Sequence, residues 1–357
     1  MIKKECFTAE WIEQVSSELH YNDKNLIEKV IRALSLLEML VKAGCPLVFK
    51  GGTALMLILG KSAHRLSIDI DLICPPGTNI EDYLKSFADF GFINLELVER
   101  KQRDDADIPK SHSKFFYQIA YRNDTDAQSY ILLDVLYEDI HYFRTQQIAI
   151  NCPFIRLEGK PLMVTVPSAE DILGDKLTAF APNTTGIPYY RNGRSFSMEI
   201  AKQLYDVGRL FENVSDLQIT KEAFRKIAVV ELSYRSFGTD IGQVFNDIRQ
   251  TALCISTRGK AGEGDFDLIQ DGIIRVKSFM YKQRYLIDHA IIDAARAAYL
   301  ATLIEKGINE IESYSNNPAD IKDMVIRPSL PNKLNKLRSN LPEAYYYWAK
   351  TSELLEA

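Results

Sequence analysis

Residues 46–55, PLVFKGGTAL, and residues 64–72, HRLSIDIDL, decide how this chain folds. The apolar run at 46–50 predicts a short buried strand, and a helical pattern that resumes at Thr53 places a strand-to-helix turn at Gly51 and Gly52. Glycines let the backbone approach a ligand closely, and the unpaired N–H groups at a helix start attract anions. The turn therefore suits a triphosphate, with the Thr53 hydroxyl as a further donor, although two glycines alone are a weak signal.

The second stretch alternates apolar and polar residues over 67–73, which predicts a strand. Asp69 and Asp71 are two residues apart, so their carboxylates are expected on the same side of that strand. Two like charges so close are costly unless a cation lies between them, and Mg²⁺ prefers oxygen ligands together with substrate phosphates. The alternative is an exposed strand face that carries two solvated acids. The flanking isoleucines favour a buried strand, where unpaired acids are disfavoured.

A third acid stands inside a later apolar strand. Residues 130–137 read YILLDVLY, with Asp134 in the middle. A carboxylate in such surroundings needs a partner. Either a salt bridge supplies that partner, or Asp134 joins Asp69 and Asp71 as a third carboxylate of a metal site.

The periodicity of the whole chain predicts an α+β protein, in which a mixed β-sheet flanked by helices is followed by a mostly helical C-terminal half. We place the domain boundary at residue 190, which gives an α/β domain at 1–190 and a helical domain at 191–357. The main expected elements of the first domain are helices at 7–20, 23–43 and 79–90, strands at 92–100, 115–122 and 129–137, a polar loop at 101–113, and a helix at 168–180.

Composition excludes several classes of protein. The chain has 357 residues and a formal net charge of −5, which rules out a strongly basic nucleic-acid coat protein but leaves room for a local basic groove. Its five cysteines are scattered and never form a CxxC pair, so neither a disulfide framework nor a zinc site is expected. The N-terminus lacks the apolar core of a signal peptide, and the most apolar stretch, residues 54–59, is too short to cross a bilayer. We therefore expect a cytoplasmic protein with no membrane partner.

Taken together, these motifs resemble a known family. A GG[T/S] turn, a DxD strand and a further strand aspartate form the pattern of the nucleotidyltransferase superfamily related to DNA polymerase β. The closer resemblance is to the AbiEii/AbiGii toxin family of nucleotidyltransferase-like proteins, in the KGGTAL turn at 50–55 and the HRLSIDIDL strand. EDILGDKLTA at 170–179 and KQLYDV at 202–207 resemble two later helices of that family. Two departures are a longer gap between the turn and the DxD strand, and Gln203 where the family usually has an aspartate.

The resemblance implies metal-dependent transfer of a nucleotide from an NTP to an acceptor, with pyrophosphate leaving and Mg²⁺ or Mn²⁺ as the cofactor. The acceptor would be an RNA, such as a tRNA 3′ end, or a protein hydroxyl. The chain would be the toxin of a toxin–antitoxin or abortive-infection system, with a cognate antitoxin protein or RNA as its partner. The implied catalytic residues are Asp69, Asp71 and Asp134 as metal ligands, Lys176 as the cation that neutralises the triphosphate, and Asp206, which either fixes Lys176 or acts on the acceptor. The alternative is a catalytically degenerate member that binds nucleotide or RNA and acts through a partner protein.

Several polar residues beside these motifs admit two interpretations. Besides Gly51, Gly52 and Thr53, the candidate substrate-binding residues are Lys50, Arg65 and Ser67. Lys50 either reaches a phosphate or makes a structural ion pair at the strand end. Arg65 either clamps a phosphate or braces Asp71 by a bidentate pair, and Ser67 either reaches a phosphate or finishes the strand edge.

A basic and aromatic segment lies further along the chain. Tyr189 and Tyr190 stand beside Arg191, Arg194 and Lys202. The segment is either a groove that faces RNA or a solvated connector, and the connector is favoured.

Overall fold

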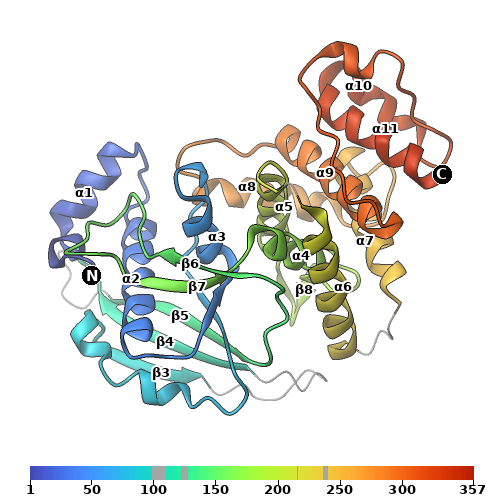
Figure 1. The fold of residues 1–357 in the computed structure, drawn as a ribbon. Coiled ribbons are helices and arrows are strands. Elements are labelled where there is room, and N and C mark those ends of the chain that lie inside the picture. The colour runs from blue at the N-terminus through green and yellow to red at the C-terminus, as the bar shows by residue number, and fades with distance from the viewer. Residues whose placement is uncertain (99–109, 122–127, 215, 236–239) are drawn as a thin grey trace. The chain divides into compact units, whose positions relative to one another are not determined.

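The computed structural model describes residues 1–98, 110–121, 128–214, 216–235 and 240–357. The chain divides into two compact units (Figure 1). Unit 1 contains Met1–Ser168 and Ser278–Arg284, and unit 2 contains Ala169–Lys277 and Tyr285–Ala357. The sequence placed a single boundary at residue 190, whereas this division falls after Ser168 and a short later segment returns to unit 1.

Unit 1 is built on a five-stranded mixed sheet with the strand order β1-β2-β5-β4-β3. β1 pairs antiparallel with β2, β2 pairs parallel with β5, and β4 pairs antiparallel with both β5 and β3. The strands of this sheet are β1 (Val48–Lys50), β2 (Ile70–Cys74), β3 (Asn94–Val98), β4 (Lys110–Gln118) and β5 (Gln128–Tyr137). The hairpin of β6 (Thr145–Ala149) and β7 (Met163–Pro167) forms a separate sheet and packs against β1.

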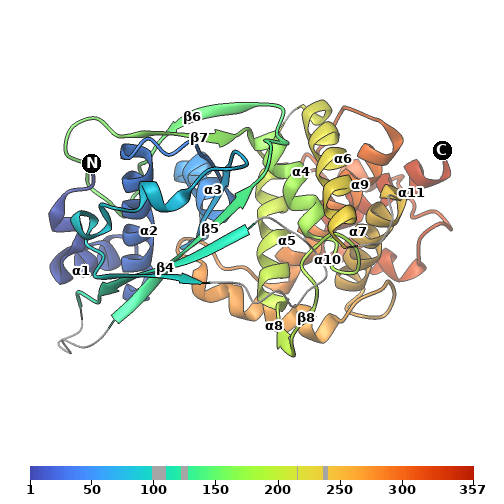
Figure 2. The same ribbon diagram turned by 90° about the horizontal axis from the view of Figure 1, so that it is seen from below.

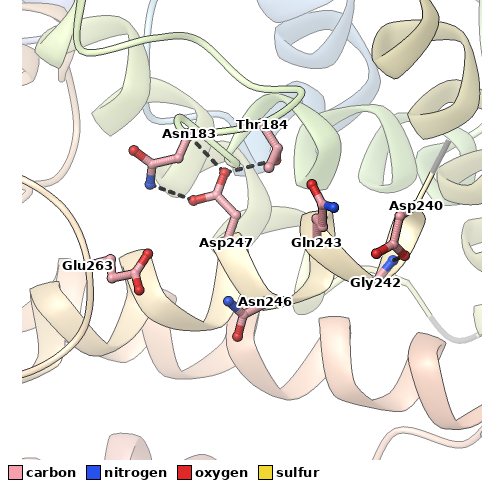
Figure 3. Close-up of a pocket in the computed structure, with 8 residues that line it drawn as sticks. All are labelled: Asn183, Thr184, Asp240, Gly242, Gln243, Asn246, Asp247 and Glu263. Carbon is pink, nitrogen blue, oxygen red and sulfur yellow. Dashed lines mark hydrogen bonds between the residues drawn. The ribbon is translucent and has the colours of Figure 1, made fainter. Parts of the chain in front are cut away.

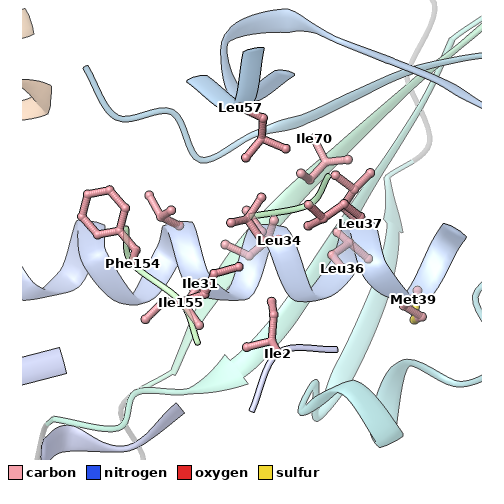
Figure 4. Packing of buried hydrophobic residues seen from close by; sticks show 14 of the residues in the cluster. Ile2, Ile31, Leu34, Leu36, Leu37, Met39, Leu57, Ile70, Phe154 and Ile155 are labelled. Atoms are coloured by element: carbon pink, nitrogen blue, oxygen red, sulfur yellow. The ribbon is translucent and has the colours of Figure 1, made fainter. Parts of the chain in front are cut away.

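Three helices belong to unit 1: α1 (Ala9–Glu18), α2 (Lys24–Lys42) and α3 (Gly51–Leu59). α2 lies along the sheet (Figures 1 and 2) and begins where the Asp23 side chain accepts a hydrogen bond from the Leu26 N–H. Its apolar stripe meets the sheet in the core, where Leu34 and Leu37 lie near Ile70 of β2 (Figure 4). Each such buried side chain contributes about 1.5–3 kcal/mol of transfer free energy.

The strand period of two separates the faces of the sheet. On β2, Ile70, Leu72 and Cys74 belong to the core that α2 covers, so Asp71 points to the opposite face. On β5, Leu133 and Val135 are buried in that core, and Asp134 between them is on the opposite face. The sheet therefore collects its acids on the side away from α2.

Several predicted elements of unit 1 need correction. The helix expected at 79–90 is two separate 3₁₀ turns, Ile80–Tyr83 and Phe87–Phe90. The segment buries Ile80, Leu84 and Phe90 without a continuous helix, because tertiary packing outweighs a weak helical preference. β4 starts at Lys110, inside the predicted loop; residues 101–109 of that loop lie outside the described part of the chain.

The DxD strand also begins later than expected. β2 starts at Ile70, and residues 64–66 before it pair with the segment that returns from later in the chain. Arg65 forms a β-bridge with Met280, and the Leu66 N–H donates to the Phe279 carbonyl at 2.8 Å. Asp69 thus precedes the strand and is exposed.

Unit 2 consists of helices and one small hairpin, which agrees with the predicted helical C-terminal half, and the predicted fold class is confirmed. The helices are α4 (Ala169–Ala179), α5 (Ser197–Phe211), α6 (Leu217–Tyr234), α7 (Ile241–Ser256), α8 (Phe266–Val276), α9 (Ile287–Lys306), α10 (Leu337–Asn340) and α11 (Pro342–Glu356), and the hairpin strands are β8 (Tyr190–Arg191) and β9 (Arg194–Ser195). No helix among the described residues has both the length and the hydrophobicity that crossing a membrane requires.

A buried carboxylate lies in the helical core of unit 2. Asp293 on α9 is 1% exposed, and its Oδ1 is 3.3 Å from the Arg296 guanidinium and 3.5 Å from that of Arg209. A Cβ on residue 208 would lie 2.0 Å from this oxygen, so Gly208 makes room for the carboxylate. Burial raises the pKa of Asp293 to about 6, against the pull of the two arginines.

We expect Asp293 to make the stability of the protein depend on pH. Between about pH 4 and pH 6 the folded chain keeps a proton on Asp293 that the unfolded chain has released. The free energy of unfolding therefore falls as the pH rises through this range. Above about pH 6 the contribution of the Asp293 proton is fully lost. Urea denaturation of wild type and Asp293→Asn across this range should show a difference that changes with pH. Asp288→Asn, at an exposed site on the same helix, is the control. Parallel pH profiles for wild type and Asp293→Asn would contradict the expectation.

Candidate active site

The strand-to-helix turn wraps closely around the Asp71 carboxylate. Lys50 at the end of β1 is the register partner of Asp71, and α3 begins at the next residue. Gly51 has a φ of +79°, and a Cβ there would lie 2.1 Å from the Asp71 Oδ2. Only glycine is compatible with both the positive φ and the close approach. The turn therefore holds this acid beside the N-terminus of α3.

The second glycine of the turn is in contact with two of the predicted substrate-binding residues. A Cβ on Gly52 would lie 2.7 Å from the Ser67 Oγ and 2.9 Å from the Arg65 Nη2. Arg65 is 7% exposed and donates from Nη1 to the Leu66 carbonyl at 3.0 Å. The guanidinium is therefore held in a fixed position at the turn. The Lys50 ammonium lies 5.9 Å from the centre of the Tyr142 ring.

Thr53 has a different role from the one expected. Its side chain is fully buried, and its hydroxyl donates to the Asp69 carbonyl at 2.7 Å. The hydroxyl proton is thus used within the protein and is not offered to a phosphate. Thr53 instead ties the start of α3 to the backbone at Asp69.

Two of the three predicted carboxylates are direct neighbours in the sheet. Asp71 and Asp134 are register partners on the parallel strands β2 and β5, so their side chains leave the sheet on the same face. The Asp134 side chain is 32% exposed and Asp71 is partly buried, whereas Asp69 lies one residue before β2. The sheet therefore brings Asp71 and Asp134 together, with Asp69 at its edge.

His112 is a residue of this site that the sequence did not single out. It is the register partner of Asp134 on β4, and its Nδ1 is hydrogen-bonded to the Asp134 Oδ1. His112 lay in the predicted loop at 101–113; only a strand assignment from residue 110 would have put it beside Asp134. Asp134 thus has a hydrogen-bonding partner within the protein, on the same face as Asp71.

The donor atoms of this edge suit a magnesium ion that also binds substrate. Carboxylate oxygens are the ligands that Mg²⁺ prefers, and it is commonly held by one or two carboxylates plus substrate phosphates. Among the described residues, no group of three or more His, Cys, Asp or Glu side chains is arranged to hold a metal ion. The pair Asp71–Asp134 fits a magnesium site in which two carboxylates and substrate phosphates share the ion. The described residues do not form a site in which the protein alone supplies all the ligands.

The two residues predicted from the later helices meet in unit 2. Lys176 on α4 has its ammonium 3.0 Å from the Asp206 Oδ2 on α5, and it donates to the Gln203 Oε1 at 2.9 Å. The side chains of Lys176 and Asp206 are 8% and 2% exposed. Gln203, where the family usually has an aspartate, keeps an acceptor for the lysine without adding a second charge.

A pocket of about 310 Å³ opens elsewhere in unit 2 (Figure 3). Asp247 lies at its base and accepts hydrogen bonds from Asn183 and Thr184 at 2.8–2.9 Å. Its polar lining residues are Asn183, Thr184, Asp240, Gly242, Gln243, Asn246, Asp247 and Glu263, which include none of the predicted site residues. Burial raises the Asp247 pKa, and its hydrogen bonds indicate a structural role in joining α7 to the segment after α4.

The mixed sheet, the glycine turn on an acidic strand and the buried lysine–aspartate pair define a protein of the nucleotidyltransferase class. The family model described as nucleotidyl transferase AbiEii toxin, type IV TA system, matches residues 34–319, so the chain belongs to this family of toxins and is a nucleotidyltransferase.

Similar structures have been solved. The chain is similar to JHP933 from Helicobacter pylori, with 16% identity and a TM-score of 0.38 over 86% of this chain and 95% of that one. It is also similar to MenT4, a nucleotidyltransferase toxin from Mycobacterium tuberculosis H37Rv, with 14% identity and a TM-score of 0.44 over 82% of this chain and 89% of that one. No curated protein matches the chain.

We expect Gly51→Ala to disrupt the turn more than an alanine at another glycine of positive φ. The added Cβ would collide with the Asp71 carboxylate, whereas at Gly77, with φ +83°, nothing lies within 4 Å. Both variants carry the backbone cost of about 1 kcal/mol, but only Gly51→Ala displaces a site acid. Thermal melting and nucleotide incorporation should both fall for Gly51→Ala, while Gly77→Ala keeps its activity. Equal behaviour of the two variants would contradict this geometry.

The buried pair in unit 2 makes a second prediction. Lys176→Ala removes the ammonium that lies 3.0 Å from the buried Asp206 Oδ2, and we expect a loss of about 3–5 kcal/mol in the free energy of unfolding. The double variant Lys176→Met/Asp206→Leu should lose less, because no unpaired charge remains. Lys221→Ala is the matched control, since this buried lysine bonds to a neutral amide, that of Asn309. Chemical denaturation measures the free energy of unfolding of the two single variants and the double variant. Equal losses in all three would show that the Lys176–Asp206 ion pair does not compensate a buried charge.

Proposed function

We propose that this chain transfers a nucleoside monophosphate from an NTP to a hydroxyl on an RNA, such as a tRNA 3′ end, or on a protein, with release of pyrophosphate. The observation that carries the proposal is the register pairing of Asp71 and Asp134 beside the turn at Gly51. That arrangement combines acid ligands with a helix N-terminus, and transfer at phosphorus needs both charge neutralisation and anion binding.

The residues of the site are proposed to have different roles in binding the triphosphate and the metal ion. The backbone N–H groups at Gly51 and Gly52 would hold the triphosphate, with Arg65, Ser67 and Lys50 as further donors. Mg²⁺ or Mn²⁺, held by Asp71 and Asp134 together with the phosphates, with Asp69 one residue before β2, would lower the pKa of the attacking hydroxyl and stabilise the leaving oxygen.

Further groups are proposed to position these residues. His112 would fix the orientation of the Asp134 carboxylate through its hydrogen bond. In unit 2, Asp206 would hold the Lys176 ammonium in position through their ion pair.

Membership of a type IV toxin–antitoxin family supports a toxin role and a cognate antitoxin, either a protein or an RNA. We propose that the toxin acts in the cytoplasm, where NTPs and RNA acceptors are available. The antitoxin would then either prevent the nucleotide transfer or reverse its consequences.

One observation favours a second candidate function. Because no group of three acid, histidine or cysteine side chains in the described residues is arranged for a metal, a degenerate member that binds nucleotide or RNA without catalysis is the alternative. Such a protein would act through a partner. The two candidates differ in whether label from the NTP becomes covalently attached to an acceptor.

We expect Asp71→Asn to lower nucleotide incorporation by more than about a hundredfold with little change in thermal melting, because the amide has the same shape but is a poor metal ligand. The measurement incubates the protein with each α-phosphate-labelled NTP, Mg²⁺, and total RNA or lysate, and follows the labelled band. Asp82→Asn, at a site 59% exposed on a 3₁₀ turn, is the control. Full activity of Asp71→Asn would refute the metal assignment, and no labelled band with the wild type would favour the degenerate candidate.

A further inference from the structure

The sheet face that carries Asp71 and Asp134 continues across β5 and β4. From Asp134, every second residue along β5 leads to Leu132 and Tyr130. Their register partners on β4 are His112, Lys114 and Phe116, respectively. The same face of β4 begins at Lys110, so it carries two lysines, a histidine and an aromatic ring in alternate positions. We call Lys110, Lys114, Phe116 and Tyr130 the lysine–aromatic face.

The lysine–aromatic face is more exposed to solvent than the opposite face of β4 and β5, which is buried. Phe115, Tyr117 and Ile131, on the side of α2, are at most 1% exposed. Tyr130 is 44% exposed, and the Lys114 side chain is 30% exposed. Cross-strand aromatic pairs stabilise sheets, but burial of these rings would do so more effectively than leaving Tyr130 in water. Tyr130 thus presents an aromatic surface to solvent on this side of the sheet.

The two rings and their cations form a compact group. The Phe116 and Tyr130 centroids are 5.7 Å apart at an interplanar angle of 54°. The Lys114 ammonium is 5.6 Å from the Tyr130 centroid, and the Lys29 ammonium is 5.7 Å from it. Glu96 on β3 accepts a hydrogen bond from the Lys114 ammonium at 3.2 Å. Lysines beside an exposed ring supply charge for phosphates and a surface for bases.

We propose that the lysine–aromatic face binds the single-stranded end of an RNA acceptor, whose bases stack on Tyr130 and Phe116 and whose phosphates meet Lys110 and Lys114. This inference rests on the proposed function and selects RNA over protein as the acceptor. Tyr130 is four residues from Asp134 on one strand, or about 13 Å, which a short single-stranded end can cover. The bound strand would run along β5 toward the acid pair.

Stacking explains why the acceptor would be single-stranded. Bases inside a duplex present only their edges, whereas unpaired bases offer a π-face to an aromatic side chain. The same sheet face carries Asp71, Asp134 and Glu96, so the attraction for phosphates is local to the two lysines of β4. A peptide acceptor would gain little from exposed rings flanked by ammonium groups.

The test is the binding of a fluorescent oligoribonucleotide of about 12 nucleotides to the full chain, measured by anisotropy without NTP. Tyr130→Ala and Tyr130→Leu should each weaken binding by at least about fivefold, because both remove the stacking surface while leucine keeps apolar bulk. Tyr130→Phe should bind like the wild type. A blunt duplex RNA should bind more weakly than the single strand.

The lysines are tested by the salt dependence. Lys114→Ala should lower the slope of log affinity against log salt by about 0.7, and Lys85→Ala, at a site 78% exposed between two 3₁₀ turns, should leave the slope unchanged. KM for the NTP is measured on every variant and should not change, which separates loss of acceptor binding from loss of fold or of nucleotide binding.

Three results would overturn the inference. Unchanged RNA binding by Tyr130→Ala would do so, as would loss of binding only on substitution of the exposed Tyr190 in the β8–β9 hairpin. Labelling of a protein acceptor at the same rate by wild type and Tyr130→Ala would also overturn it, and would leave the proposed nucleotide transfer intact. Conversely, RNA binding that depends on Tyr130 in a chain that transfers no nucleotide would support the surface and remove the proposed activity.

Discussion

The close approach between the Asp71 carboxylate and the Cα of Gly51 is the constraint on which the site depends. It holds because residue 51 has no Cβ and a φ of +79°, so that β1 can turn directly into α3 over an acidic strand. The same turn rests on Ser67 and Arg65 through Gly52. A backbone fitted this tightly around one carboxylate fixes where a phosphate and its cation can lie relative to the sheet.

The acidic side chains of the two units differ in their burial and in their partners. In unit 1, Asp71 and Asp134 are neighbours and only partly buried, which suits groups that must meet an outside cation. In unit 2, the pairs Lys176–Asp206 and Asp293–Arg296 are buried and paired within the protein. Removing one member of a buried ion pair lowers the stability of the fold. A loss of activity in such a variant is therefore interpreted together with its measured stability.

Sequence periodicity was sufficient for the elements with strong local signals. The apolar stripe of α2, the KGGTAL turn and the apolar β5 around Asp134 all carry their own patterns. It was insufficient where distant segments decide the structure. The returning segment 278–284 pairs with the residues at 64–66 ahead of β2, and the pairing of β4 with β5 extends a strand into polar residues at 110–113 and brings His112 to Asp134. The Thr53 hydroxyl is bonded to a carbonyl that only the folded chain brings near.

The central claim is that Asp71 and Asp134 together bind the catalytic cation in the presence of a nucleotide. The most direct measurement is the anomalous scattering of Mn²⁺ in crystals of the protein grown with a non-hydrolysable NTP analogue. The account predicts a manganese peak bound by carboxylate oxygens of both residues and by phosphate oxygens of the analogue at the turn of Gly51. A nucleotide bound at this turn without manganese between the two strands, or manganese bound elsewhere in the chain, would contradict it.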